Sequence, residues 1–279
     1  MNGFITTEQL AARLDGTGLR VLDLRGGFAI YQENHIPGAQ FLHIETLRMS
    51  EHGVPCKMHA LPVLGSIFGR LGIHRETPVV AYATRPLDHI SATYTVWSLA
   101  VTGNTRGIVL DGGMNRWTAE ERPLTQQYPD VSETCYQVDF DESIFADLHY
   151  VAEKLDDPGV VLVDSRTRGQ YDGTAGTTMR LGHLPGAILH NYIWDFHPDG
   201  TYLPLPALRE RYRRAGIVPE KEIITYCVTG REGSAIWFML KCLLGYPRVR
   251  LYQASLSEWA AHPELPMING GEPGLRHAA

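Results

Sequence analysis

Four cysteines carry the greatest potential for covalent chemistry in this sequence, and the setting of Cys227 differs from that of the others. Cys227 directly follows residues 223–226, an apolar run with the composition of a buried strand. After it comes a short polar loop of Val228, Thr229, Gly230, Arg231, Glu232 and Gly233. Residues 234–244 are apolar on nearly every side and predict a buried helix that Gly245 ends. Cys227 is therefore expected where a strand turns into a helix, at the carboxyl edge of a parallel sheet, where open α/β folds place their sites.

A thiol at such a junction is predicted to act as a nucleophile. Loop amides and the positive end of a helix dipole favour an anion, which for a cysteine means a reactive thiolate. Arg231 adds a positive charge four residues on, whereas Glu232 places a negative charge on the same loop. We therefore expect the pKa of Cys227 to lie below the ordinary thiol value of about 8.5.

The other three cysteines lack this setting. Cys242 lies among leucines of the apolar segment and is expected to serve in packing, and Cys56 and Cys135 lie in loop or linker contexts without a basic partner. No two cysteines have the Cys-x-x-Cys spacing, and no histidine pair has the spacing of a helical or zinc-finger site. We expect neither a metal nor another cofactor.

The two halves of the chain resemble each other, which indicates a tandem duplication. Five matched segments follow in the same order at nearly constant spacing: 21–25 with 161–166, 35–39 with 183–187, 72–73 with 216–217, 79–82 with 223–226, and Trp117 with Trp259. Each half alternates apolar strand-like runs, such as 20–24, 78–82 and 107–110, with helical patterns. Continuous apolar strands bounded by helices predict an α/β fold with a parallel sheet covered on both faces.

The segment 121–140 has little periodicity and contains prolines, so it is interpreted as a linker. We predict an N-terminal domain of residues 1–125 and a C-terminal domain of residues 126–279. The register that aligns Tyr82 with Tyr226 places Ala83 at the position of Cys227. The N-terminal domain is therefore predicted to be catalytically silent and to form one wall of the site.

Residues that occur in both the active and the silent half are expected to be structural. The shared residues are His35 and His183 in loops, Trp117 and Trp259 in the cores, and the pairs Asp23 with Arg25 and Asp164 with Arg166. For Asp164 and Arg166 a buried pair and a supporting role near the active loop both remain open.

Together these motifs resemble the tandem-domain rhodanese family of thiosulfate and 3-mercaptopyruvate sulfurtransferases over essentially the whole chain. The resemblance rests on Asp-Leu-Arg and Asp-Ser-Arg after the first strand of each half, the two His-x-Pro-Gly-Ala motifs, the segments 110–117 and 251–259, and the strand–Cys–loop–helix. It implies two rhodanese-like domains, each a parallel sheet with helices on both faces. It also implies that Cys227 takes a sulfane sulfur from a donor, becomes a persulfide, and passes the sulfur to cyanide or a thiol.

The loop departs from both patterns of this family. Members that use thiosulfate typically carry an Arg and a Lys where this sequence has Gln170 and Thr229, and the Cys-Gly-[Ser/Ala]-Gly-Val loop of the mercaptopyruvate type is also absent. The candidate donor-binding cations are Arg231, Arg180, Arg168 and Arg166, with Asp164 in support. We favour thiosulfate as donor. A 3-mercaptopyruvate sulfurtransferase, or a persulfide carrier without fast turnover, is the alternative.

Other function classes are disfavoured by sequence. Related dual-specificity phosphatases share the strand–Cys–loop–helix plan, but their phosphate-binding Arg would stand at Gly233. With 25 Lys+Arg against 31 Asp+Glu, the net charge is −6, so we expect no nucleic-acid partner. No apolar run reaches the ~18 residues of a membrane span, and the N-terminus lacks a signal-peptide pattern, so we expect a cytoplasmic protein without membrane contact.

Overall fold

The computed structural model describes residues 3–14, 18–84 and 89–270, which fold into two compact units. The first unit consists of Met1–Arg48, His59–Asp141 and Phe196–Leu203, and the second of Met49–Met58, Glu142–Asp195 and Pro204–Ala279. These units divide the chain differently from the sequence, because residues 126–141 pack on the first unit, where the Thr134 amide donates to the Gly69 carbonyl at 2.8 Å. A domain boundary between residues 125 and 126 stays a prediction.

The first unit is built on a parallel five-stranded sheet in the order β1-β7-β6-β2-β3. Its strands are β1 (Gly3–Ile5), β2 (Arg20–Asp23), β3 (Ala39–Phe41), β6 (Val79–Tyr82) and β7 (Gly107–Leu110). The predicted strands at 20–24, 78–82 and 107–110 are confirmed. All four residues of β6 are buried, as expected for a central strand with helices on both faces.

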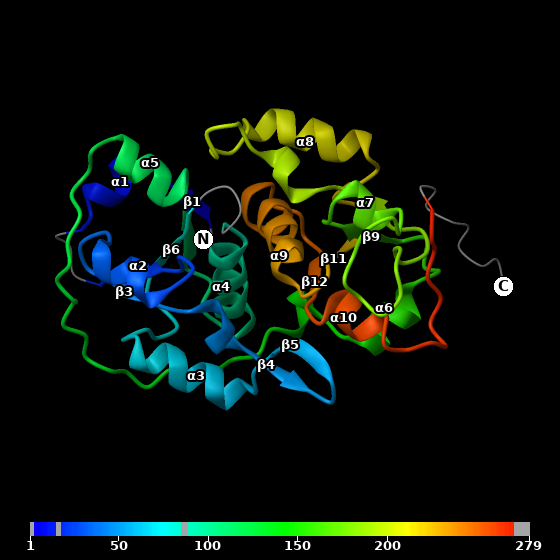
Figure 1. The fold of residues 1–279 in the computed structure, drawn as a ribbon, viewed down its shortest axis with the longest axis horizontal. Helices are drawn as coiled ribbons and strands as arrows, with labels where there is room; N and C mark the ends of the chain where they lie inside the picture. The colour runs from blue at the N-terminus through cyan, green and yellow to red at the C-terminus, as the bar shows by residue number, and fades with distance from the viewer. Residues whose placement is uncertain (1–2, 15–17, 85–88, 271–279) are drawn as a thin grey trace. The chain divides into compact units, whose positions relative to one another are not determined.

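Helices cover both faces of this sheet (Figure 1). They are α1 (Thr7–Ala11), α2 (Phe28–Glu33), α3 (Leu61–Arg70), α4 (His89–Val101) and α5 (Gly113–Ala119), with a 3-10 turn, η1, at Ile44–Leu47. Val80 and Tyr82 join the cluster that holds Leu10 of α1 and Trp117 of α5. Because side chains alternate along a strand, Val79 and Ala81 point to the opposite face, where α4 packs on β6 and β7.

The second unit repeats this architecture in the corresponding strand order, β10-β9-β11-β12-β8, again all parallel. Its strands are β8 (Phe145–Ala146), β9 (Val160–Asp164), β10 (Ile188–Leu189), β11 (Glu222–Tyr226) and β12 (Val249–Tyr252). Its helices are α6 (Leu148–Lys154), α7 (Arg168–Tyr171), α8 (Leu205–Arg214), α9 (Arg231–Trp237) and α10 (Ser255–Trp259), with 3-10 turns η2 (Glu142–Ile144) and η3 (Tyr192–Asp195). The predicted tandem α/β fold is confirmed.

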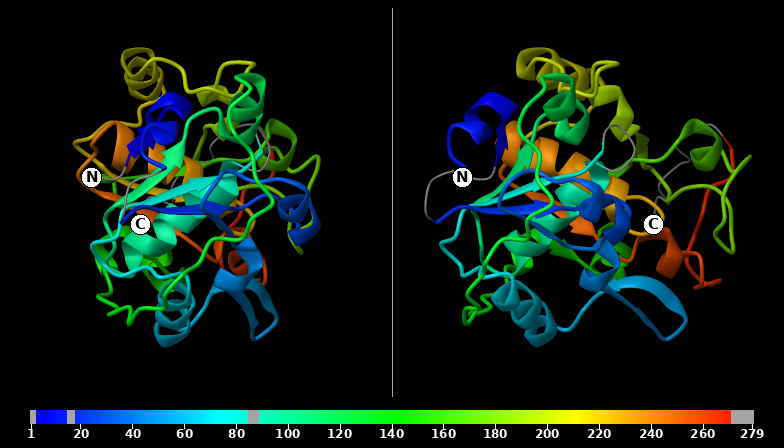
Figure 2. Two further views of the ribbon diagram at one scale, coloured as in Figure 1. Left: turned by 90° about the vertical axis from the view of Figure 1, so that its left-hand side faces the viewer. Right: turned by 60° about the vertical axis from the view of Figure 1, so that its left-hand side comes forward.

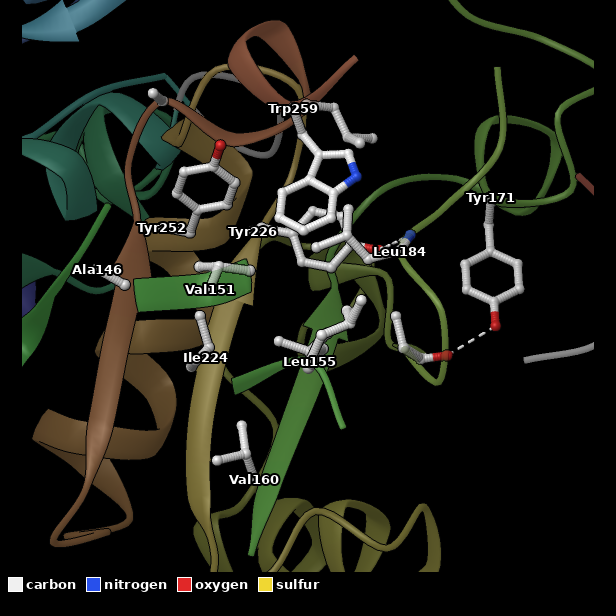
Figure 3. Packing of buried hydrophobic residues seen from close by; sticks show 14 of the residues in the cluster. Ala146, Val151, Leu155, Val160, Tyr171, Leu184, Ile224, Tyr226, Tyr252 and Trp259 are labelled. Carbon is white, nitrogen blue, oxygen red and sulfur yellow. Dashed lines mark hydrogen bonds between the residues drawn. The ribbon is translucent and has the colours of Figure 1, made fainter. Parts of the chain in front are cut away.

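One face of the second sheet packs against α6 and α10. Figure 3 shows Trp259 and Tyr252 over Ile224, with Val151 of α6 and Leu155, the residue after this helix, beside them. The other face is covered by α9, which contacts β11 and β12. The apolar run after Cys227 therefore forms the buried helix that its composition predicts, and it continues beyond α9 as the π-helical segment η4 (Phe238–Leu243).

Each unit also includes a segment from the other half of the sequence. The hairpin of β4 (Arg48–Glu51) and β5 (Val54–Met58) is light blue near the bottom of Figure 1 and of both views in Figure 2, and all of it except Arg48 belongs to the second unit. Its Met58 amide donates to the Gln253 side chain at 2.8 Å. Conversely, Phe196–Leu203 belongs to the first unit, where the Tyr202 amide donates to the Asp111 carboxylate at 3.2 Å.

Within the described ranges, no helix combines the length and apolar character needed to cross a membrane.

Candidate active site

Cys227 lies directly after β11, as the sequence predicts, but α9 begins at Arg231, three residues before the predicted start at residue 234. Arg231, Glu232 and Gly233 therefore form the first turn of the helix, because the left-handed backbone of Gly230 lets the helix begin early. Cys227 is buried, with 1% of its surface exposed. Its backbone N–H donates to the Ser255 hydroxyl at 3.1 Å, and its carbonyl accepts from the Leu256 amide at 3.3 Å. The start of α10 therefore fixes the backbone that carries the thiol.

Two glycines allow the loop to fold tightly above the sheet. Gly230, the N-cap of α9, has a left-handed backbone with φ of 82°. A Cβ at this position would lie 2.4 Å from the carbonyl oxygen of Gln253. At Gly233 a Cβ would lie 2.9 Å from a Leu251 methyl and 3.2 Å from the Tyr226 backbone. A side chain at either position would push the loop away from β11 and β12.

The folded loop directs three backbone N–H groups at the sulfur of Cys227. The amides of Thr229, Glu232 and Gly233 hydrogen-bond to it and lower its pKa. Burial acts in the opposite direction and is the larger effect, and the nearby charge of Glu232 adds to it, so that the pKa of the Cys227 thiol is raised to about 12. Our expectation of a depressed pKa is wrong for the resting site, because desolvation of a fully buried thiolate outweighs the stabilisation by the loop amides.

Glu232 and Cys227 shift the pKa of each other. Its pKa is raised, mainly by burial and further by the charge of Asp164, whereas the hydrogen bond with Cys227 and the charges of Arg166 and Arg231 lower it. The thiol and this carboxyl thus lie side by side in a site that disfavours charge on both of them.

Asp164 and Arg166 form a buried ion pair below the loop. Two hydrogen bonds of 2.9 and 2.6 Å join the guanidinium to the carboxylate, and a third of 2.8 Å runs to the Gly182 carbonyl. The same pair occurs as Asp23 and Arg25 in the silent half. The repetition supports the structural interpretation, while the charge of Arg166 still acts on Cys227.

Among the other candidate cations, the structure corrects the donor-binding role predicted for Arg180. Its guanidinium donates to four backbone carbonyls at and after the end of α10, those of Trp259, Ala260, His262 and Leu265. These bonds occupy the guanidinium in capping a helix, so Arg180 does not serve the donor. Arg168 is mostly exposed, pairs with Asp172 and lies over the Tyr171 ring. A role in donor binding stays a prediction for Arg231, which begins α9, and for Arg166 and Arg168.

The structural roles expected for the shared histidines and tryptophans are confirmed. His183 and His35 are fully buried, and the Nδ1 atom of each contacts a backbone carbonyl, that of Tyr171 at 2.8 Å and of Tyr31 at 2.9 Å. Trp117 and Trp259 are fully buried in their respective cores. Each indole N–H donates to a proline carbonyl in the segment that follows its helix.

The sequence interpretation missed two residues that support the loop. The Ser255 hydroxyl accepts a hydrogen bond from the Cys227 amide, and the backbone of Ser255 has a left-handed φ of 54°. Gln253 lies with its backbone against Gly230, and its side chain is held by Cys56 and Met58 of the β4–β5 hairpin. Both residues fall in the segment 251–259 that repeats in the family, but only the tertiary structure shows that this segment contacts the loop.

In the first unit, Ala83 occupies the corresponding position after β6 and is buried. Its carbonyl accepts the Met114 amide at 3.0 Å, much as the Cys227 carbonyl accepts the Leu256 amide. Most of the loop after it, residues 85–88, lies outside the described residues. Among the described residues of both units, no group of three or more His, Cys, Asp and Glu side chains is arranged to hold a metal ion.

Comparisons with known proteins show which family and which relatives this chain is similar to. The Rhodanese-like domain matches the chain twice, at residues 6–120 and 147–262. The chain is 32% identical over 280 residues to the sulfur carrier protein TtuD of Thermus thermophilus, covering 96% of this chain and 97% of that protein. It is also 32% identical over 269 residues to the thiosulfate sulfurtransferase of Azotobacter vinelandii, covering 94% and 96%. Among solved structures, an anaerobic ergothioneine biosynthesis enzyme from Chlorobium limicola shares the fold with a TM-score of 0.87 at 22% identity, covering 96% of this chain and 70% of that one.

Proposed function

Because the chain belongs to the rhodanese family, we propose that it is a sulfurtransferase in which Cys227 carries the transferred sulfur as a persulfide. The observation that supports this most directly is the convergence of the Thr229, Glu232 and Gly233 amides on the sulfur of Cys227. A ring of preorganised N–H donors stabilises an anionic sulfur pair without a metal or a cofactor.

The reaction proceeds by covalent catalysis in two steps. In the first, the Cys227 thiolate attacks the sulfane sulfur of the donor, a new S–S bond forms, and the old S–S bond breaks with its electron pair leaving on sulfite. In the second, the acceptor attacks the outer sulfur of the persulfide and the Cys227 thiolate leaves. With thiosulfate and cyanide, the products are sulfite and thiocyanate, and the enzyme returns to its starting state.

We propose thiosulfate as the donor. Relatives named thiosulfate sulfurtransferase match over most of the chain in Azotobacter vinelandii and in Pseudomonas aeruginosa. Thiosulfate carries two negative charges, so its site needs cations to offset desolvation. Arg231 begins α9 directly after the loop and is the candidate for this role, with Arg166 as the buried cation beneath it.

Two alternatives keep the same persulfide chemistry. A relative of Pseudomonas aeruginosa named "Probable 3-mercaptopyruvate sulfurtransferase" is 31% identical over 283 residues, and TtuD is named a sulfur carrier protein. The first alternative changes only the donor. The second replaces fast turnover by delivery of the sulfur to a partner. The proposal places the activity in the cytoplasm, with a small-molecule donor and a small-molecule acceptor.

The first domain is proposed to be catalytically silent. Ala83 provides no nucleophile. In the alignment that matches Ala83 with Cys227, Pro86 takes the position of Gly230.

The test is the mass of the protein after treatment with thiosulfate. We expect an adduct of about 32 Da on the peptide that contains Cys227, and its loss when cyanide is added. Continuous thiocyanate production identifies an enzyme, whereas one discharge per protein identifies a carrier. Cys227→Ser is expected to form no adduct, and an adduct that persists in this variant would contradict the proposal.

A further inference from the structure

Strand β5 comes from the first half of the sequence, yet it belongs to the unit that contains Cys227. It holds the side chain of Gln253, a residue with 2% of its surface exposed. The amide oxygen of Gln253 accepts a hydrogen bond from the Met58 amide at 2.8 Å, and its amide nitrogen donates to the Cys56 carbonyl. Both ends of this buried polar group are therefore bonded to the same strand.

An ion pair attaches β5 to the same region at a second point. The Lys57 ammonium lies 3.3 Å from the carboxylate of Glu258 in α10 and 3.0 Å from that of Glu51 in β4. The other oxygen of Glu258 accepts a hydrogen bond from the Tyr252 hydroxyl at 3.0 Å. The strand thus contacts the chain at Gln253 and again at Glu258, and it fixes the segment between these two residues.

This segment is the support on which the Cys227 loop folds. Besides its contacts with Cys227 described above, the amide and the hydroxyl of Ser257 both donate to the Val228 carbonyl, at 2.9 and 2.7 Å. The Gln253 carbonyl oxygen lies so close to Gly230 that a hydrogen atom is the largest substituent that fits there. A displacement of the segment would therefore move the loop backbone, whose N–H groups have to face the sulfur to stabilise an anion.

The first unit shows the same exchange of segments around a different side chain. Asp111 follows β7 as Gln253 follows β12, and its carboxylate accepts the Tyr202 amide at 3.2 Å. In the register of the central strands β6 and β11, Tyr202 stands at the position of Met58. An ionised carboxylate accepts hydrogen bonds but cannot donate one, whereas the amide of Gln253 does both. The two-ended contact therefore distinguishes the unit with the nucleophile.

We propose that Gln253 is a positioning residue for the persulfide chemistry of Cys227, and that the first half of the sequence contributes to the reaction through the strand that holds it. β5 fixes the Gln253 side chain, and the Gln253 backbone fixes Gly230 and the turn that directs the loop N–H groups. The inference rests on the proposed function. It adds that the geometry of the loop depends on Met58, which lies 195 residues earlier in the chain.

The test is the rate of persulfide formation by Gln253→Leu, which removes both hydrogen bonds and nearly keeps the volume of the side chain. Excess thiosulfate converts Cys227 to the persulfide in a single turnover, and the adduct of about 32 Da is followed by mass. The rate constant at saturating thiosulfate is expected to fall by about tenfold or more, whereas the half-saturating concentration changes by less than about threefold. The two differ because the loop N–H groups act on the sulfur of Cys227 and not on the sulfonate end of the donor.

Asp111→Leu is the matched control, because it breaks the equivalent contact in the unit without the nucleophile. Its melting temperature is expected to fall, but its rate constant is expected to stay within about twofold of the wild-type value. Gln253→Asn is a milder second variant, since its amide is one methylene group too short to reach both Met58 and Cys56. An intermediate fall in the rate constant is expected for it. All rates are measured well below the melting temperature of each variant.

The outcomes separate this inference from the proposed function. If the folded Gln253 variants keep the wild-type rate constant, if Asp111→Leu loses as much as they do, or if only the half-saturating concentration changes, the inference is overturned. A wild-type protein that forms no adduct on Cys227 would contradict the proposed function itself. A normal Cys227 adduct together with unchanged Gln253 variants would leave the sulfurtransferase intact and remove only the role of Gln253.

Discussion

At the scale of single residues, the position of the nucleophile is predictable from sequence but its ionisation is not. A strand, a cysteine and a glycine-containing loop before an apolar helix place Cys227 at the sheet edge, and this placement is confirmed. The sign of the pKa shift depends on how completely tertiary packing removes water from the thiol. With 1% of Cys227 exposed, burial raises the pKa more than the loop amides lower it.

Arg180 shows the same limit of sequence reasoning. Arg180 lies in the half of the sequence that contains Cys227, which suggested a role in the site. The direction of its guanidinium group is instead set by backbone carbonyls that lie about eighty residues later in the sequence. A local pattern does not contain these partners. Glu232 was visible only as a negative charge on the loop, because the burial that raises its pKa depends on tertiary packing.

Arg231 is the residue whose substitution tests the choice of donor. Arg231→Ala is expected to weaken thiosulfate use by about 1.5–3 kcal/mol, on the order of tenfold or more in kcat/KM, because a dianion depends more on a charged hydrogen-bond donor than a monoanion does. 3-Mercaptopyruvate, with one carboxylate, is expected to lose less. The measurement is steady-state kcat/KM for both donors. Equal losses, or none for thiosulfate, would mean that the dianion is held elsewhere.

At the scale of elements, the loop keeps its shape because α10 and β12 support it from outside the loop itself. Ser255 accepts the Cys227 amide, and the Gln253 backbone leaves space at Gly230 only for a hydrogen atom. Gln253 is in turn held by β5. Strands, helices and the repeated strand order were predictable because they follow from local apolar patterns, whereas these cross-element contacts require the folded chain.

Gly230→Ala separates the shape of the loop from general stability. The added methyl group would lie 2.4 Å from the Gln253 carbonyl, so the loop is expected to move and the yield of Cys227 persulfide to fall at least tenfold. Gly245→Ala is the control, because Gly245 has a similar φ of 72° but nothing within 4 Å of its added Cβ. Both variants carry about 1 kcal/mol of backbone strain, measured as a lower melting temperature. Similar persulfide yields in the two would show that the close approach to Gln253 is unimportant.

At the scale of the whole molecule, the duplication is visible in sequence, but the exchange of segments is not. The repeats predict two α/β units, and the strand orders confirm them. The hairpin at 49–58 belongs to the second unit and the segment 196–203 to the first. Local sequence patterns do not predict this exchange, because it depends on contacts between distant parts of the chain. The two units share their buried Asp–Arg pairs and differ in the residue after the central strand.

Ala83→Cys tests whether the silent domain lacks only the thiol. In a Cys227→Ser background, this variant is expected to form no persulfide with thiosulfate, because the loop lacks the glycines of the active one. In particular, Pro86 stands at the position of Gly230, and a proline cannot adopt the left-handed φ of 82° that Gly230 has. The readout is the mass of the protein and of its peptides after thiosulfate treatment. An adduct of about 32 Da on the peptide that carries the introduced thiol would show that a thiol alone makes this sheet edge active.

The most direct test of the account is the steady-state rate of thiocyanate formation from thiosulfate and cyanide by Cys227→Ser, measured beside Cys242→Ser. Cys242 lies in η4, farther along the helix that begins at the loop, and has no place in the proposed reaction. The account predicts that Cys227→Ser falls to the uncatalysed background while Cys242→Ser retains most of the wild-type rate. A Cys227→Ser protein that still produces thiocyanate at a substantial fraction of the wild-type rate would contradict it.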